Sequence, residues 1–101
     1  MREKGEKAVA VIELNNKRRD RHDIVAEILR TAREGRIKTH IMYRAKLSYS
    51  QVNTYLRLLI EKGFLENSTI RRKRQDINVY RTTQKGIRYI EKIEAVNTLL
   101  S

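Results

Sequence analysis

Four cations stand side by side in the run Arg71-Arg72-Lys73-Arg74 of this 101-residue chain. Adjacent positive charges repel one another and lower stability unless a polyanion neutralises them. On a hairpin tip the run would project beyond the domain and meet a phosphate backbone or a minor groove. It therefore predicts contact with a polyanion, most simply nucleic acid. The alternative is a basic loop that serves only solubility.

The net charge of +11 is concentrated in two segments of the sequence. Residues 35–57 hold five bases and no acid, and residues 68–86 hold six bases and one acid, so each segment carries +5. A surface that is merely solvated usually mixes both signs. If the fold places the two segments side by side, they form one positive face. A solvated basic surface without a partner is the alternative.

Most catalytic and metal chemistry lacks the residues it would need. The absence of cysteine excludes disulfides, thiolate catalysis and cysteine-ligated zinc. The two histidines, His22 and His40, are too few and too far apart for a histidine-based metal cluster. No nucleophile–base pair, carboxylate dyad or glycine-rich phosphate loop is recognisable. We therefore expect no enzymatic activity, no metal and no cofactor.

Signals for membrane insertion or export are also missing from the sequence. The longest uninterrupted apolar run, residues 8–12, has five residues. A spanning helix needs about 20, and the apolar part of a signal peptide needs about 7 to 15. The expected location is the cytoplasm, in association with the nucleoid, and the length allows one domain with an appended helix.

Apolar periodicity divides the chain into short elements. Residues 23–34 repeat apolar side chains on one helical face, with Asp20 or Asp23 as a possible N-cap and Gly35 as a left-handed stop. Beyond it the pattern predicts a short helix over 39–45, a helix over 49–62, strands over 64–67 and 77–80, and a helix from Thr83 onward. Between the two strands lies the basic tip.

This order describes a winged helix-turn-helix, which is mainly α with a small β-hairpin, followed by a C-terminal helix. The turn between the second and third helices, Lys46-Leu47, is short, as the motif requires. Ser48 and Gln51 have the spacing of a capping box, and Gly63 can end the third helix. The predicted division is a basic N-terminal extension over 1–21, a winged helix-turn-helix domain over 22–82 and a C-terminal helix over 83–101.

The third helix carries the groups that could read bases. In a helix-turn-helix the second helix of the pair enters the major groove, N-terminal residues closest to the base edges. Ser50, Thr54 and Arg57 form a polar stripe opposite the apolar face; Arg57 could bind guanine, and Gln51 or Asn53 adenine. Ordinary surface polarity is the alternative. The predicted set is Ser48, Tyr49, Ser50, Gln51, Asn53, Thr54 and Arg57.

Polar and basic side chains around the turn are predicted to bind phosphates. They would set register and affinity rather than read sequence. For His40, a neutral surface or half-buried ring is an equal alternative, and Tyr43 and Tyr49 could be core residues, phosphate donors or both. The predicted phosphate contacts outside the wing are Lys38, Thr39, His40, Arg44 and Lys46.

Three groups of residues resemble one known family. The stretch from Lys38 to Tyr49, KTHIMYRAKLSY, resembles the helix-turn-helix core of small archaeal winged-helix DNA-binding proteins, both chromatin-associated and regulatory. The match continues through Tyr55-Leu56, Leu59 and Gly63-Phe64-Leu65, and then through Tyr80, Thr83, Lys85 and Gly86, where the wing closes and the last helix opens. The resemblance covers about residues 23–93. Its first stretch is the more specific, because Thr-x-Lys-Gly is common to many winged-helix regulators.

The resemblance implies a homodimer that binds double-stranded DNA, is joined by an antiparallel coiled coil of C-terminal helices and has no enzymatic activity. The last helix has the required apolar spacing of 4, 3 and 4 residues, widened by Ile87 and Ile90. The predicted dimerisation residues are Tyr89, Ile90, Ile93, Val96 and Leu100.

The chain departs from the family pattern in its short last helix of about two heptads, its more basic wing tip and its additional N-terminal residues. The extension contains an apolar patch, Ala8–Leu14. This patch could be an added strand, a helical turn at a dimer interface, or part of a disordered arm that lies on DNA through Arg2, Lys4, Lys7, Lys17-Arg18-Arg19 and Arg21. Because a two-heptad coil is marginal alone, we expect the patch to reinforce the dimer.

Three functions follow from these features, and an enzyme is the least expected class. The first is a transcriptional regulator that reads DNA sequence as a homodimer, and the polar stripe favours it. The second is an architectural chromatin protein with little sequence preference, which the wing and the net charge suit equally. The third is a winged helix whose basic face binds an acidic protein or RNA. The target site, any effector and the direction of regulation are not encoded in recognisable motifs.

Overall fold

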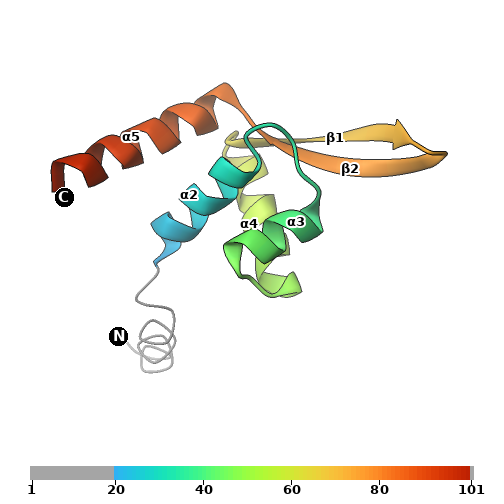
Figure 1. Cartoon of the computed structure of the whole chain (residues 1–101), viewed down its shortest axis with the longest axis horizontal. Coiled ribbons are helices and arrows are strands. Elements are labelled where there is room, and N and C mark those ends of the chain that lie inside the picture. The colour runs from blue at the N-terminus through green and yellow to red at the C-terminus, as the bar shows by residue number, and fades with distance from the viewer. Residues whose placement is uncertain (1–19, 101) are drawn as a thin grey trace.

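The computed structural model describes residues 20–100 as four helices and one antiparallel hairpin. Their order is α2 (Arg21–Thr31), α3 (Lys38–Ala45), α4 (Tyr49–Glu61), β1 (Leu65–Arg72), β2 (Gln75–Thr82) and α5 (Gln84–Leu100). The hairpin extends from one side of the helical body, and α5 extends toward the opposite side (Figure 1). The winged-helix prediction is confirmed. Most of the predicted extension, with its apolar patch, lies outside the described residues.

Helix α2 begins two residues earlier than predicted because both candidate caps act together. The Asp20 carboxylate accepts a hydrogen bond from the Asp23 backbone N–H at 2.9 Å, and the Asp23 carboxylate accepts one from the Asp20 N–H at 3.3 Å. This reciprocal pair is a capping box. Asp20 and Arg21 therefore belong to the folded domain. The helix ends at Thr31, so Gly35, with φ +94°, shapes the following loop rather than the last helical turn.

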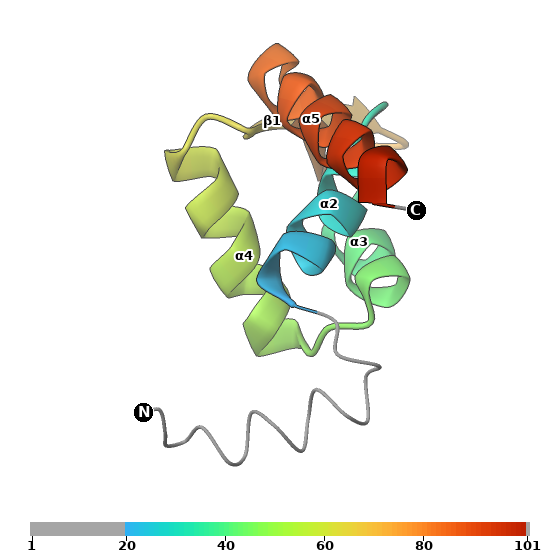
Figure 2. The same cartoon turned by 90° about the vertical axis from the view of Figure 1, so that its left-hand side faces the viewer.

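The helix-turn-helix follows the predicted pattern closely. Helix α3 ends at Lys46, which adopts a left-handed conformation with φ +57° without being glycine. Ser48 then caps α4: its Oγ accepts from the Gln51 N–H at 3.1 Å, and Gln51 Oε1 accepts from the Ser48 N–H at 2.9 Å. The predicted capping box is confirmed. Figure 2 shows α2 between α4 and α3, with α5 above α2.

The strands of the wing are twice as long as predicted, eight residues each. The polar residues that separate the two apolar patches had indicated a loop. In the structure they pair across the ladder: Thr69 donates to the Asn78 side chain at 3.2 Å, and Arg71 donates to Asp76 at 2.9 Å. Such cross-strand pairs stabilise a sheet without burial. The hairpin therefore remains regular almost to its tip.

One core joins all the helices and the base of the wing. Its largest fully buried side chains are Ile28, Leu29, Ile41, Val52, Leu59 and Ile90. Ile90, 0% exposed, was predicted as a dimer contact; the structure corrects this, because its side chain packs inside the protomer. The first turns of α5 therefore share the core of the 22–82 segment. Within residues 20–100, no helix is long and apolar enough to cross a membrane.

The junction between the wing and α5 is clamped onto the end of α4. Thr83 Oγ1 donates to the Gly63 carbonyl at 2.6 Å and accepts from the Gly86 N–H at 3.1 Å, so Thr83 caps α5 as predicted. Lys85 Nζ donates to the Lys62 carbonyl at 2.8 Å. These bonds satisfy carbonyls that the end of a helix leaves open. The Thr-x-Lys-Gly element is thus a structural clamp.

Gly86 is required by close packing rather than by its backbone conformation. A Cβ at this position would collide with the Phe64 carbonyl oxygen and would lie 2.6 Å from Thr82 Cγ2. Neither group can move freely, since Thr82 is buried and its hydroxyl donates to the Leu29 carbonyl at 2.6 Å. The start of α5 can therefore pack this closely against the α4–β1 loop and the end of β2 only with glycine at position 86.

We expect Gly86→Ala to destabilise the domain by about 3 kcal/mol, because overpacking against backbone costs about 1–3 kcal/mol and occasionally more. Gly63→Ala is the matched control: its φ of +81° strains an alanine, yet the nearest side-chain atom to the new Cβ is 3.7 Å away. That control should lose only about 1 kcal/mol. Urea unfolding followed by circular dichroism measures both, and equal losses would contradict the packing argument.

Candidate nucleic-acid interface

The predicted reading face of α4 is exposed at its centre. Ser50, Thr54 and Arg57 all reach solvent on the side of the helix opposite Val52, Leu56 and Leu59, which are buried. Thr54 Oγ1 donates to the Ser50 carbonyl at 3.1 Å, so its lone pairs remain available as acceptors. The polar stripe predicted from periodicity therefore exists as a surface.

Two members of the predicted set already have a structural role. Ser48 Oγ and Gln51 Oε1 are both used in the capping box. The Gln51 amide nitrogen still has two donors, but a bidentate contact to adenine needs its oxygen as well. Asn53, half-buried at the edge of the stripe, takes no part in the cap, but its side chain is hydrogen-bonded with the Tyr49 phenol. Both amides therefore have a structural partner, which each would have to exchange to pair with adenine.

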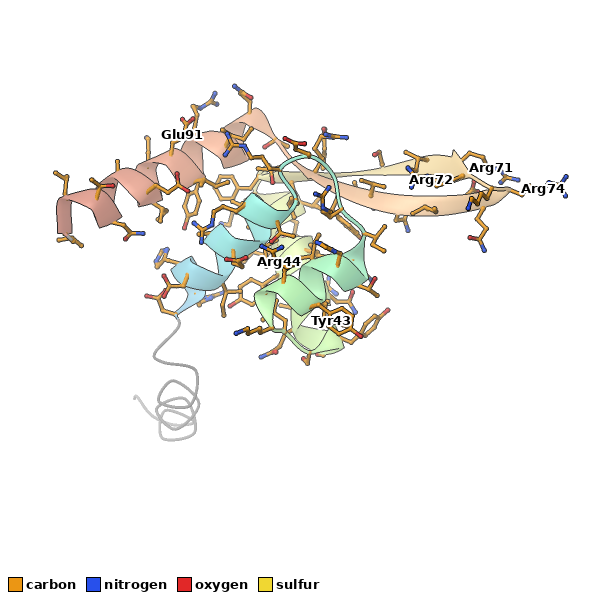
Figure 3. The ribbon with its side chains drawn as sticks, in the orientation of Figure 1. Tyr43, Arg44, Arg71, Arg72, Arg74 and Glu91 are labelled. Atoms are coloured by element: carbon orange, nitrogen blue, oxygen red, sulfur yellow. The ribbon has the colours of Figure 1, made fainter. Side chains whose placement is uncertain are left out.

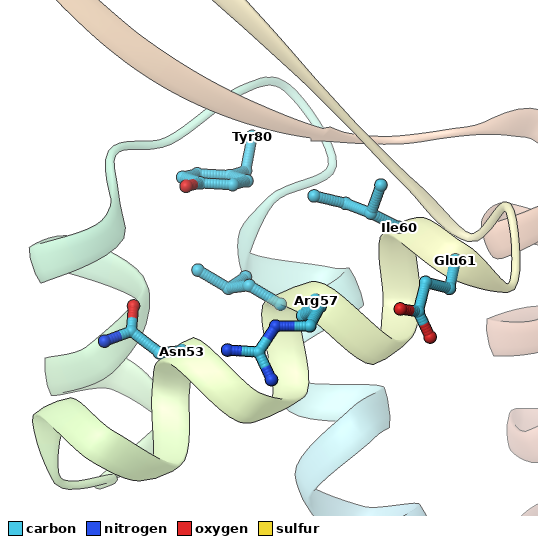
Figure 4. A pocket seen from close by; sticks show the side chains of 6 residues that line it. Asn53, Arg57, Ile60, Glu61 and Tyr80 are labelled. Atoms are coloured by element: carbon cyan, nitrogen blue, oxygen red, sulfur yellow. The ribbon is translucent and has the colours of Figure 1, made fainter.

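The exposed face of α4 opens into a concavity below the base of the wing. Asn53, Arg57, Ile60 and Glu61 of α4 line it together with Tyr80 of β2, and its volume is about 360 Å³ (Figure 4). The concavity shows that the part of α4 that carries Asn53 and Arg57 faces the base of the wing at Tyr80. Glu61 places a carboxylate in the same concavity, which offsets part of the Arg57 charge.

Tyr49 at the start of α4 is held in a cationic setting. Its ring is 62% exposed, and Lys38 Nζ lies 5.0 Å from the ring centroid. A hydrogen bond with the Asn53 side chain lowers the pKa of the Tyr49 phenol, and the nearby Lys38 ammonium lowers it further. A phenol in this environment is a stronger hydrogen-bond donor toward an anion. Tyr49 is thus a surface group, which resolves the alternative of a core residue.

Helix α3 presents a second polar surface beside this one. Tyr43, 76% exposed, and Arg44 project from α3 on the side away from the core (Figure 3). The sequence alone does not decide whether Tyr43 is a core or a surface residue, because a tyrosine at this spacing fits both. The structure places it on the surface. Every predicted α3 contact is accessible: Thr39, His40, Arg44 and Lys46 are exposed, and Lys38 is half-buried.

The wing tip is a two-residue turn made of Lys73 and Arg74. Their φ angles are +51° and +67°, a conformation that side chains other than glycine and asparagine rarely adopt. Arg71 is exposed but forms an ion pair with Asp76, which offsets part of its charge. Arg72, Lys73 and Arg74 thus supply most of the positive charge at the tip.

The predicted contacts form two groups rather than one continuous patch. Arg71, Arg72 and Arg74 lie at the far end of the hairpin, whereas Tyr43 and Arg44 lie on the helical body (Figure 3). The concavity lined by Arg57 and Tyr80 lies between α4 and the base of the hairpin. The two +5 segments therefore form a helical surface and a projecting hairpin (Figure 1), not one continuous positive face.

The predicted dimer residues of α5 fall into two groups: those that pack against the rest of the protomer and those that are exposed to solvent. Tyr89 is half-buried; its hydroxyl lies 3.0 Å from His22 Nδ1 and its ring 5.1 Å from that of Phe64. Ile93 is half-buried, and Val96 is half-exposed. Leu99 and Leu100 are 83% and 80% exposed, and Leu99 was not predicted. Glu91 projects from the side of α5 that faces away from the other helices (Figure 3).

Metal binding finds no support in the part of the chain that the structure describes. Residues 20–100 contain no group of three or more His, Asp or Glu side chains close enough to hold an ion. His22 is paired with Tyr89, and His40 is exposed on α3.

A sequence comparison identifies the relatives of this fold. A family model described as winged helix-turn-helix matches residues 18–101. Uncharacterized protein MJ0287 of Methanocaldococcus jannaschii is 38% identical over 61 residues, which cover 54% of this chain and 63% of that protein. The chain thus spans less than two thirds of the length of this archaeal relative.

Solved structures of other proteins share the fold of this chain. Sso10a-2, a DNA-binding protein from Sulfolobus solfataricus, is 25% identical, with a TM-score of 0.68 over 80% of this chain and 81% of that one. A PadR family transcriptional regulator from Eggerthella lenta is 20% identical, with a TM-score of 0.69 over 94% of this chain and 87% of its own; this second likeness concerns the fold alone. With the family match over residues 18–101, these comparisons show that the chain belongs to the winged helix-turn-helix family.

Proposed function

We propose that this protein is a transcriptional regulator that binds double-stranded DNA as a homodimer. The observation that supports the proposal most is the concavity between α4 and the base of the wing, where Asn53 and Arg57 of the predicted reading helix lie opposite Tyr80 of β2. Sso10a-2, which is similar in structure, is a DNA-binding protein, and the similar structure from Eggerthella lenta is a PadR family transcriptional regulator. The +11 net charge supplies the electrostatic attraction that duplex binding needs.

In this proposal α4 lies in the major groove and its exposed stripe reads bases. Arg57 has the forked donor geometry that guanine O6 and N7 accept, and Asn53 can pair with adenine. Ser50 and Thr54 supply shorter contacts to either kind of base edge. The groups at the start of α4 and along α3, among them Tyr43, Tyr49 and Lys38, bind phosphates and set the register.

The wing supplies affinity rather than sequence information. Its two-residue tip carries cations beyond the end of the strand ladder, where they reach a phosphate backbone or a minor groove. A hairpin that projects from the helical surface suits a duplex, because a double helix is a curved surface that a flat patch would touch along only one line.

In this proposal, dimerisation uses the C-terminal half of α5, which projects beyond the core of the protomer. Ile93, Val96 and Leu100 continue the apolar line that starts at Tyr89, and the last of them is exposed in the protomer. Pairing these residues with a second copy would bury apolar surface at about 25 cal/mol per Å². Two reading helices would then address half-sites about 34–36 Å apart, or a multiple of that spacing.

An architectural chromatin protein is the second candidate, favoured by the exposed cations that lie outside the reading helix. Selection of bound duplexes from a random pool, followed by competition with random-sequence DNA at physiological salt, separates the two functions. Enrichment of one sequence supports regulation, and a specificity ratio near one supports the architectural role. No duplex binding would reject both and favour an acidic protein or RNA partner.

The double substitution Lys73→Asn with Arg74→Gly should weaken binding to all duplexes alike while leaving the fold intact. Asn-Gly is the preferred pair for this left-handed turn, so stability should hold or rise. Each lost phosphate contact should reduce the log–log salt slope by about 0.9. Arg88→Ala with Lys92→Ala, which removes two cations from α5, is the charge-matched control. Equal slopes for both variants in a salt titration would exclude the wing from DNA contact.

Arg57→Ala should lose affinity mainly at one base pair of the selected site, by about 1–3 kcal/mol, because a bidentate contact discriminates between bases. Arg44→Ala on α3 serves as the comparison and should weaken binding by a similar factor on every sequence. Binding measurements on the selected duplex and its single-base variants test this. A uniform loss for Arg57→Ala would mean a phosphate contact instead.

Val96→Asp with Leu100→Asp should convert the dimer to a monomer without unfolding the domain, since neither side chain belongs to the core. Ala95→Asp places a charge on an exposed position away from the apolar line and should leave the dimer intact. Light scattering gives the mass, and circular dichroism the fold. A dimer that survives the double substitution would rule out this face of α5.

A further inference from the structure

A second hollow lies on the side of the domain away from the wing tip, among α2, α4 and α5. Its volume is about 450 Å³, and Val25, Leu58 and Leu59 form its apolar wall. Phe64 and Tyr89 contribute aromatic rings that are only partly buried. The hollow is separate from the proposed DNA surface, and no part of that function requires it.

The rim of this hollow carries charges of both signs: the Asp20 carboxylate is near enough to Tyr89 to raise the phenol pKa, after the larger effect of burial, and two cations also line the hollow. Arg21 and Lys62 line it from α2 and from the end of α4. Lys85 Nζ, which binds the Lys62 carbonyl, lies 5.2 Å from the centre of the Phe64 ring. An apolar hollow with cations at its edge fits an apolar segment that carries a carboxylate.

The chain itself holds such a segment within reach. Residues 8–14 read AVAVIEL, six apolar residues with Glu13 among them. The described chain starts at Asp20, and the next residues, Arg21 and His22, line the hollow. The six steps from Leu14 to Asp20 span at most about 20 Å when extended, which is more than enough to return to a hollow bordered by the first turn of α2.

We propose that residues 8–14 of the same chain dock in this hollow, with Glu13 at the Arg21–Lys62 edge. Docking would cover the exposed parts of Phe64 and Tyr89 and would hold the base of α5 against α2 and α4. It gives the apolar patch a place within the protomer, and it reinforces the proposed dimer indirectly by fixing the helix that carries the dimer contacts.

Because the natural chain has no cysteine, a pair of introduced cysteines tests the docking directly. In the full-length protein, Glu13→Cys with Lys62→Cys replaces the proposed ion pair by two thiols. Mild oxidation should form an intrachain disulfide at least about tenfold faster than in the control pair Glu13→Cys with Ala95→Cys, since docking raises the effective concentration of one thiol near the other. Non-reducing electrophoresis and intact mass give the product.

The possible outcomes separate the occupants of the hollow. A fast intrachain disulfide in the first pair alone supports the proposal. A disulfide between two chains would mean that a second copy supplies the segment, and equal rates in the two pairs would mean no docking; either result overturns it. Val11→Asp with Ile12→Asp adds a second measurement, which should raise binding of the apolar dye ANS to the full-length protein. Unchanged dye binding would likewise count against docking.

Discussion

The close approach of α5 at Gly86 to the loop that follows α4 and to the end of β2 is the constraint on which the rest of the arrangement depends. The backbone of Phe64 and the side chain of Thr82 leave no space there for a Cβ. Thr83 and Lys85 tie the same point to the last carbonyls of α4. The chain therefore leaves the wing and enters α5 at a fixed place and direction. As a result, the wing projects to one side of the helical body and α5 to the other (Figure 1).

This division gives each side of the domain a different surface. The wing side has exposed cations and polar side chains over a concavity that contains Arg57, and the α5 side has exposed leucines and a hollow with aromatic walls. Two surfaces of such different polarity can be used at the same time, because a partner on one does not cover the other. The fold thus allows association between protomers to proceed without loss of the basic surface.

The sequence predicted the elements of the fold because local signals at both ends of the helices were consistent. Asp20 with Asp23, and Ser48 with Gln51, are short-range caps that need no tertiary information. The length of the wing was underestimated because its outer half is stabilised by pairs such as Arg71–Asp76, which period-two hydrophobicity does not detect. Ile90 was misplaced for a related reason: a heptad face and a core face overlap on α5, and only the packing of α2 against it distinguishes them.

The backbone conformation of Lys73 and Arg74 indicates why the wing tip carries two cations. Lys73 and Arg74 both occupy left-handed backbone regions, at a cost of about 1–2 kcal/mol each relative to residues suited to that region. Every other cation of the hairpin lies within a strand, where its position is set by the pleat and its side chain leaves the sheet face. The turn residues alone point past the end of the ladder. A tip selected for stability would carry Asn-Gly, so its two cations are best explained by a role that requires charge beyond the reach of the strands.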